Sequence, residues 1–162
     1  MKIHKTSPVI LMVDDDPDDY YLTKAALEES GAQTELDLVA DGQELLDYLF
    51  CRGKFVDAER PSHPSLILLD LNMPVKNGKE ALTELKADPD LRQIPVIIYT
   101  NSTAAEDIAS SYQLGASSYI PKPASFQSLV EAMGTLSKYW LDIAVLPFME
   151  SGQPPPEQPA VS

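Results

Sequence analysis

The chain has one cysteine, Cys51, and two histidines among its 162 residues. A single cysteine cannot close a disulfide within the chain, and so few cysteines and histidines exclude the clusters that hold structural zinc. Basic residues are also scarce, because 12 lysines and arginines stand against 25 aspartates and glutamates and leave a net charge of −13. A field of that sign repels phosphate backbones and anionic lipids, so we expect no direct binding to nucleic acid or to a membrane surface.

No apolar stretch approaches the roughly 20 residues that span a bilayer. The first eight residues, MKIHKTSP, lack the apolar segment of a secretory signal, and we therefore expect a cytoplasmic protein. Hydrophobic residues make up 44% of the chain, which is enough to build a core for about one domain. We expect a tail at 1–7, a domain at 8–140, an apolar extension at 141–150 and a Pro-rich, disordered tail at 151–162.

Short apolar segments alternate with segments of helical periodicity within the expected domain. The expected strands cover residues 8–13, 35–40, 66–69, 95–100 and 118–121. The expected helices cover residues 18–30, a segment around Leu45, Leu46 and Leu49, residues 78–87, residues 104–114 and a last segment from Phe126. On the first of these helices, Leu22, Ala25 and Ala26 should face the core.

Two of the expected strands, LILL and PVIIYT, show no polar alternation, which is typical of strands that are covered on both faces. Strict alternation of strands and helices predicts an α/β fold in which helices cover both faces of a parallel sheet. We therefore expect a doubly wound sheet of five strands.

Five polar side chains follow the expected strands at the same end. Asp14 and Asp15 follow the first strand, Asp70 follows the third, Thr100 closes the fourth and Lys122 follows the fifth. Since ligands of such sheets bind beyond the carboxyl ends of the strands, these residues should share one crevice. Each of them alone is explained by a solvated loop or a helix cap, but five converging loops indicate a site.

Three carboxylates in one crevice need a cation. Like charges about 4 Å apart repel by roughly 4 kcal/mol at an effective dielectric constant of 20. A hard divalent ion fits best, and Mg²⁺ binds one or two carboxylates while it keeps water and phosphate oxygens. Lys122 could then hold an anionic group, and Thr100 could form a hydrogen bond to it.

The acidic run after the first strand also matches part of a calcium-binding loop. Asp14, Asp16 and Asp18 stand where an EF-hand has its first three ligands. Asp19 and Ala25, however, occupy the positions of the required glycine and of the bidentate glutamate. The sequence therefore excludes an EF-hand.

Four motifs, in their order and spacing, resemble those of the receiver domain of two-component response regulators. They are Val13-Asp14-Asp15-Asp16, Leu68-Leu69-Asp70-Leu71-Asn72-Met73-Pro74, the strand-ending Thr100 and Tyr119-Ile120-Pro121-Lys122-Pro123. The resemblance implies a flavodoxin-like sheet with strand order 2-1-3-4-5 and five helices, followed here by a C-terminal extension. Asp70-Leu71-Asn72 also resembles phosphatases with an aspartate nucleophile, but Asn72 cannot serve as their second, proton-donating aspartate, so phosphate-ester turnover is not expected.

The resemblance implies a phosphoacceptor site. Asp70 would accept a phosphoryl group from the phosphohistidine of a sensor histidine kinase. Asp14, Asp15 and Asp70, together with the backbone carbonyl of Asn72, would hold Mg²⁺, and Lys122 would bind the phosphoryl oxygens. Beyond self-catalysed phosphotransfer and autodephosphorylation, such a protein is not an enzyme.

The resemblance also implies a conformational switch. Thr100 would move toward the phosphoryl group, Tyr119 would turn inward behind it, and the surface of helix 4, strand 5 and helix 5 would change. The Lys122-Pro123 peptide would be cis, because X-Pro bonds tolerate that isomer. Asn101 is larger than the residue that usually follows the threonine, and either Asn101 or Ser102 should cap the helix at 104–114.

The C-terminal extension points to a self-complementary surface. Apolar residues recur at spacings of three and four along the last helix, namely Phe126, Leu129, Met133, Leu136, Trp140 and Ile143. One side of this segment would pack on the sheet. The remaining apolar residues would form a homodimer contact or fold back on the domain, and the candidates are Tyr139, Trp140, Ile143, Val145, Leu146 and Phe148.

The loop at 50–65 and the extension together resemble those of single-domain regulators that pair with phytochrome-type sensor kinases. The first hypothesis is thus a stand-alone phosphoacceptor with such a partner. The alternative is an interaction module of receiver fold that no longer uses phosphate, and the presence of all five site residues argues against it.

Overall fold

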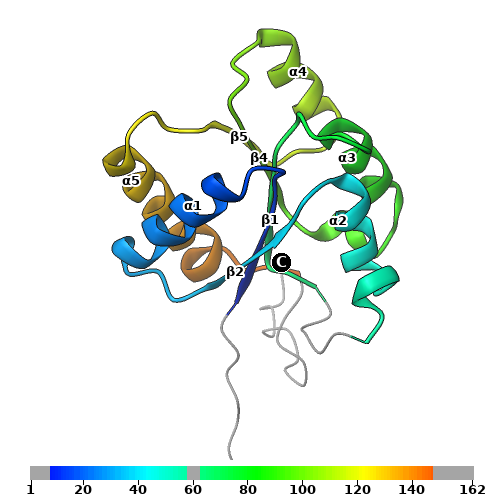
Figure 1. The fold of residues 1–162 in the computed structure, drawn as a ribbon, viewed down its shortest axis with the longest axis horizontal. Helices are drawn as coiled ribbons and strands as arrows, with labels where there is room; N and C mark the ends of the chain where they lie inside the picture. Colours follow the sequence, from blue (N-terminus) through cyan, green and yellow to red (C-terminus); the bar gives the residue numbers. More distant parts are fainter. Residues whose placement is uncertain (1–7, 58–62, 148–162) are drawn as a thin grey trace, which may run out of the picture.

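The computed structural model describes residues 8–57 and 63–147. In this part of the chain five strands alternate with five α-helices (Figure 1). In chain order the elements are β1 (Val9–Val13), α1 (Pro17–Ser30), β2 (Glu35–Val39), α2 (Gly42–Leu49), β3 (Leu66–Leu69), α3 (Gly78–Ala87), β4 (Val96–Thr100), α4 (Ala105–Gln113), β5 (Ser118–Pro121) and α5 (Phe126–Ser137). All strands run parallel in the order β2-β1-β3-β4-β5, which confirms the predicted doubly wound, flavodoxin-like sheet.

The sheet separates two hydrophobic layers, because successive side chains of a strand point to opposite faces. Leu11 and Val13 of β1 pack with α2 and α3. Ile10 and Met12, which alternate with them along β1, pack with α1 and α5. Figure 1 shows these two pairs of helices on opposite sides of the sheet. The central strands are buried on both faces, which explains why they carry apolar residues without alternation.

Helix α1 begins and ends as expected but buries a different face. Asp16 caps it by accepting a hydrogen bond from the amide of Asp18 at 2.9 Å, and Gly31 ends it with a φ of 83°. Its buried residues are Thr23, Ala26 and Leu27.

The prediction that Leu22 and Ala25 face the core is therefore wrong, since Leu22 is 50% exposed and Ala25 is exposed as well. The buried positions include Thr23, whose hydroxyl shares a hydrogen bond of 3.2 Å with the hydroxyl of Tyr99. That pairing satisfies a polar group inside the core, and apolar periodicity alone does not reveal it.

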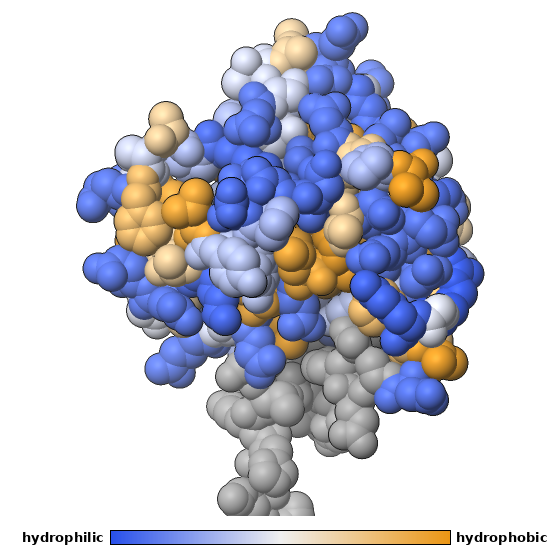
Figure 2. Space-filling model, viewed as in Figure 1, coloured by the Kyte–Doolittle hydropathy of each residue, from blue (hydrophilic) through white to orange (hydrophobic). Residues whose placement is uncertain are grey.

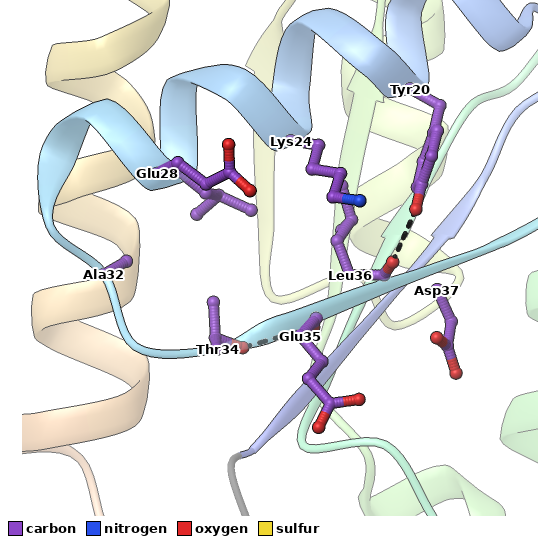
Figure 3. A pocket seen from close by; sticks show the side chains of 9 residues that line it. Tyr20, Lys24, Glu28, Ala32, Thr34, Glu35, Leu36 and Asp37 are labelled. Carbon is purple, nitrogen blue, oxygen red and sulfur yellow. Dashed lines mark hydrogen bonds between the residues drawn. The ribbon is translucent and has the colours of Figure 1, made fainter.

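A side chain from α1 forms a hydrogen bond with the free edge of strand β2. Ladder bonds toward β1 use the backbone of Glu35 and Val39, so the carbonyl of Leu36 faces the free edge. The hydroxyl of Tyr20 donates a hydrogen bond to this carbonyl at 2.9 Å (Figure 3). The hollow drawn in Figure 3 lies between α1 and β2 and is lined mainly by polar side chains, Lys24 and Glu28 among them. Capping of this kind hinders the pairing of the edge with another strand.

After α5 the chain continues in a short π-helical turn, η3 (Lys138–Ile143). A bond of 2.7 Å from the amide of Ala144 to the carbonyl of Tyr139 spans five residues and so shows the wider turn. This turn interrupts the predicted apolar stripe, whose middle residues Leu129, Met133 and Leu136 are buried, whereas Phe126 and Ile143 are 44% and 60% exposed.

Several expectations lie outside the described residues. They are the tails at 1–7 and 151–162 and the candidate contact residue Phe148. None of the helices within the described ranges is both long and apolar enough to cross a membrane.

Candidate functional site

The five side chains that the sequence placed at one sheet edge lie together in one cleft. Asp14 and Asp15 follow β1, Asp70 follows β3, Thr100 ends β4 and Lys122 follows β5. The full lining of the cleft is Asp14, Asp15, Asp16, Asp19, Asp70, Asn72, Thr100, Asn101 and Lys122. Seen as in Figure 1, the surface of the molecule is mostly hydrophilic (Figure 2), in keeping with its acidic composition.

Ladder hydrogen bonds fix these residues because they continue beyond the strand ends. The amide of Asp14 donates to Val39 and the amide of Asp70 donates to Val13, each at 3.0 Å. The amide of Lys122 donates to the carbonyl of Thr100 at 2.8 Å. The backbone of the cleft is thus as firmly placed as the sheet itself.

Lys122 is the central cation of the cleft. Its Nζ lies 2.6 Å from Oδ2 of Asp14, 2.7 Å from Oδ2 of Asp19 and 3.6 Å from Oδ2 of Asp70. Its side chain is only 8% exposed. Burial by itself lowers the pKa of a lysine, but the hydrogen bonds to Asp14 and Asp19 and the charge of Asp70 outweigh it and raise the pKa of Lys122. Lys122 therefore carries a full positive charge at neutral pH.

Asp14 is the most deeply placed carboxylate of the cleft. Its side chain is 1% exposed, and its two oxygens accept hydrogen bonds from Lys122 and from the amide of Asp16. Burial raises the pKa of Asp14 above its ordinary value, although the bond to Lys122 opposes this shift. A buried carboxylate of this kind gains from any cation that reaches it.

The acidic residues of the cleft fit a divalent cation. Carboxylate oxygens of Asp14, Asp15 and Asp70 lie within 4.8 Å of one another. The side-chain atoms of the cleft that can bind a metal are oxygens. The nitrogen atoms in its lining belong to the ammonium of Lys122 and to the side-chain amides of Asn72 and Asn101. Such a hard donor set suits ions that prefer oxygen and offers nothing to a thiophilic metal.

Thr100 and Tyr119 are connected through Ser102. Thr100 is fully buried, and its Oγ1 lies 3.5 Å from the amide of Ser102. The hydroxyl of Tyr119 donates to the carbonyl of Ser102 at 2.9 Å. The sequence indicated Thr100 and Tyr119 as switch residues, whereas it indicated Ser102 only as a possible helix cap.

Ser102 also ties this loop to α4. Its hydroxyl donates to Oδ2 of Asp107 at 2.6 Å, and Lys79 of α3 donates to Oδ1 of Asp107 at 2.7 Å. These hydrogen bonds lower the pKa of Asp107. A continuous chain of contacts thus leads from the cleft to α3 and α4, and only the folded structure reveals it, because Lys79 and Asp107 are 28 residues apart.

Two local predictions are wrong. The Lys122-Pro123 peptide is trans, as are all peptide bonds of the described residues, in line with the general preference of X-Pro bonds. No side chain caps the start of α4, where Ala104 stands. The hydroxyl of Ser102 donates to Asp107 and accepts a hydrogen bond from the amide of Ala104, which precedes the helix.

Asp19 is the site residue that sequence reasoning missed. It lies in the first turn of α1 and contacts Lys122 across the cleft. Its position three residues after the N-cap Asp16 was the available signal, because that position turns toward the same edge of the sheet.

Comparison with known proteins gives concordant matches. A model of the response regulator receiver domain matches residues 10–134. The response regulator Rcp1 of Synechocystis sp. is 36% identical over 139 residues, which cover 86% of this chain and 92% of Rcp1. The domain limits of 8–140 suggested by the sequence remain a prediction.

Solved structures are similar over most of the chain. The crystal structure of the phosphorylated cyanobacterial phytochrome response regulator RcpA gives a TM-score of 0.79 at 38% identity and covers 88% of this chain and 100% of that chain. The Mn²⁺-bound form of Rcp1 gives a TM-score of 0.77 at 35% identity, with 87% and 99% covered.

The glycine that begins α3 is predicted to be essential for the geometry of the cleft. A Cβ at Gly78 would lie 2.2 Å from the carbonyl oxygen of Asp70 and 2.8 Å from Cα of Leu71. Gly78→Ala should therefore lower the free energy of unfolding by about 2 kcal/mol or more, as overpacking typically does. Urea unfolding at neutral pH measures this change.

Gly134→Ala is the matched control for this prediction. Gly134 lies in α5, and a Cβ there would meet only the side chain of Ser30 in α1, at 3.3 Å from its Cβ and 3.9 Å from its Oγ. Alanine is favoured in a helix interior, so we expect a change below about 1 kcal/mol. Equal stability of the Gly78→Ala variant and the unchanged protein would contradict the close packing described here.

Proposed function

Because the chain belongs to the response regulator receiver domain family, we propose that it is a stand-alone response regulator that accepts a phosphoryl group on Asp70 from a sensor histidine kinase. The observation that carries this proposal is the placement of Lys122 between Asp14 and Asp70 in a cleft with Thr100. The similarity extends over 92% of the length of Rcp1, itself a response regulator, which supports this proposal. We place it in the cytoplasm, where such kinases present their phosphohistidine.

The proposed reaction is a phosphoryl transfer. A carboxylate oxygen of Asp70 attacks the phosphorus of the phosphohistidine in line, an acyl phosphate forms, and the bond to the imidazole nitrogen breaks. The added negative charge meets the carboxylates of Asp14 and Asp15, so Lys122 must move its ammonium onto the phosphoryl oxygens. Positioning and charge neutralisation of this kind account for most of the catalysis in phosphoryl transfer.

We assign the metal site to Asp14, Asp15, Asp70 and the backbone carbonyl of Asn72. When bound there, Mg²⁺ supplies positive charge beside the phosphoryl oxygens. The clustered carboxylate oxygens support a divalent cation, and the preference of Mg²⁺ for carboxylate and phosphate oxygens favours this ion.

The proposed switch uses the contacts around Ser102. Thr100 leaves the amide of Ser102 and forms a hydrogen bond to the phosphoryl group, while Tyr119 releases the carbonyl of Ser102 and turns inward. Since Ser102 also holds Asp107 of α4, this movement reaches the surface formed by α4, β5 and α5. Phosphorylation shifts the balance between the two arrangements only by such differential contacts.

A phytochrome-type kinase is the proposed phosphodonor. The support is the similarity to RcpA, a cyanobacterial phytochrome response regulator. Apart from self-catalysed phosphotransfer and autodephosphorylation, we propose no enzymatic activity. The alternative, a phosphate-independent interaction module, is disfavoured because Asp14, Asp70 and Lys122 are all in place.

Phosphotransfer from purified, autophosphorylated kinases tests the proposed partner. A phytochrome-type histidine kinase should transfer its label to the chain at least about tenfold faster than an unrelated sensor kinase, because a favourable contact of about 1.4 kcal/mol gives that ratio. Asp70→Asn should abolish transfer, whereas Asp90→Asn, which alters an exposed aspartate outside the cleft, should leave it unchanged. Equal transfer from both kinases would rule out the specific pairing, and label on the Asp70→Asn variant would rule out the assigned acceptor.

We also propose that the chain forms a homodimer through its C-terminal apolar surface. Tyr139, Ile143 and Val145 are 51%, 60% and 73% exposed. Trp140 and Leu146 are partly buried beside them, and Phe148 completes the candidate set from outside the described residues. A hollow between β5, α5 and η3 adjoins Tyr139 and Trp140 and offers a place for apolar side chains of a second copy.

The molar mass in solution tests the dimer. Light scattering after size exclusion should give twice the mass of the chain, and the double substitution of Tyr139→Ser with Ile143→Glu should give the monomer. Val56→Glu is the matched control, because Val56 is equally exposed, at 63%, but lies beyond α2. If the unchanged protein is a monomer both before and after phosphorylation, the proposed contact is refuted.

A further inference from the structure

Two carboxylates of the cleft, Asp16 and Asp19, have no part in the reaction proposed above, and of these two Asp19 contacts Lys122. Oδ2 of Asp19 lies 2.7 Å from Nζ of Lys122, whereas Oδ2 of Asp70 lies 3.6 Å from it. The ammonium is thus held closer to Asp19 than to the acceptor. Since the side chain of Lys122 is only 8% exposed, water cannot replace a lost partner at low cost.

The position of Asp19 is fixed by a helix. It lies in the first turn of α1, whose start is held by the cap of Asp16 and by Pro17. Helix α1 in turn packs against α5 and buries Ala26 and Leu27 in the core. Asp19 therefore presents its carboxylate from a rigid element, so that its contact with Lys122 does not depend on a loop.

Asp14, the other close partner of Lys122, is also a candidate metal ligand. Its Oδ2 accepts the hydrogen bond from Lys122, and its Oδ1 accepts one from the amide of Asp16. A divalent cation at Asp14 would therefore compete with Lys122 for the same carboxylate. When Lys122 gives up Asp14, Asp19 is the close carboxylate that remains to it.

We propose that Asp19 is a positioning residue that retains the ammonium of Lys122 when Asp14 turns to a divalent cation. This inference rests on the proposed function, and it adds Asp19 as the residue that holds Lys122 beside Asp70. Without Asp19, Lys122 would stay on Asp14 or move onto Asp70, and in either case it would obstruct the cation or the acceptor oxygen.

Asp16 provides a matched control. It lines the same cleft and carries the same charge as Asp19, but none of the contacts of Lys122 in the structure goes to it. Its side chain caps α1, and asparagine caps a helix as well as aspartate does. Asp16→Asn therefore removes a neighbouring charge without removing a partner of Lys122.

Calorimetric titration with MgCl₂ at neutral pH, without a phosphodonor, tests the inference. Asp19→Asn should weaken binding by about tenfold or more, the usual effect of removing a residue that orients a metal ligand. Asp16→Asn should weaken it by about threefold or less, since an exposed charge is well screened. Asp19→Glu keeps a carboxylate within reach of Lys122 and should restore most of the affinity.

A double-mutant cycle keeps the test decisive if one variant is unstable. In a Lys122→Met background, Asp19→Asn should have no larger effect on Mg²⁺ affinity than Asp16→Asn. Equal losses for Asp19→Asn and Asp16→Asn in the unchanged background would overturn the inference, because charge alone would then explain them. Failure of the unchanged protein to accept phosphate on Asp70 would instead overturn the proposed function, and the two results are measured separately.

Discussion

One buried ammonium among five carboxylates is the constraint on which the rest of the site depends. The cleft is lined by Asp14, Asp15, Asp16, Asp19 and Asp70, and Lys122 is the one basic side chain in that lining. Each close pair of like charges is unfavourable by roughly 4 kcal/mol at an effective dielectric constant of 20, so the cluster persists only with a cation at its centre. The same imbalance leaves room for the charge of a divalent ion, and it gives Lys122 three carboxylate partners within 3.6 Å.

The parallel sheet makes this concentration of charge possible. Its strands are apolar and buried, and they leave chemistry to the residues just past their ends. Ladder bonds that continue to Asp14, Asp70 and Lys122 hold these residues without the need for flexible loops. The contacts of Ser102 with Tyr119 and Asp107 then connect the cleft to α4.

Periodicity and strand ends were enough to predict the sheet and the five residues that meet at its edge. They failed where a side chain is chosen by a partner far away in the sequence. Thr23 is buried instead of Leu22 because its hydroxyl shares a hydrogen bond with that of Tyr99, 76 residues away. The expected cap of α4 failed for a local reason, since Ser102 donates to Asp107 within the same segment. Likewise, the π-helical turn at η3 rotates Ile143 out of the stripe that a regular helix would continue. Asp19 resembles Thr23 in this respect, since its partner Lys122 is 103 residues away.

The intact mass of the protein after incubation with a small phosphodonor and Mg²⁺ tests the central claim most directly. The account predicts an increase by one phosphoryl group, which disappears when Mg²⁺ is removed by a chelator and when Asp70 is replaced by asparagine. A folded protein that gains no mass under these conditions, or that gains it equally without Asp70, would contradict the account and favour an interaction module that works without phosphate.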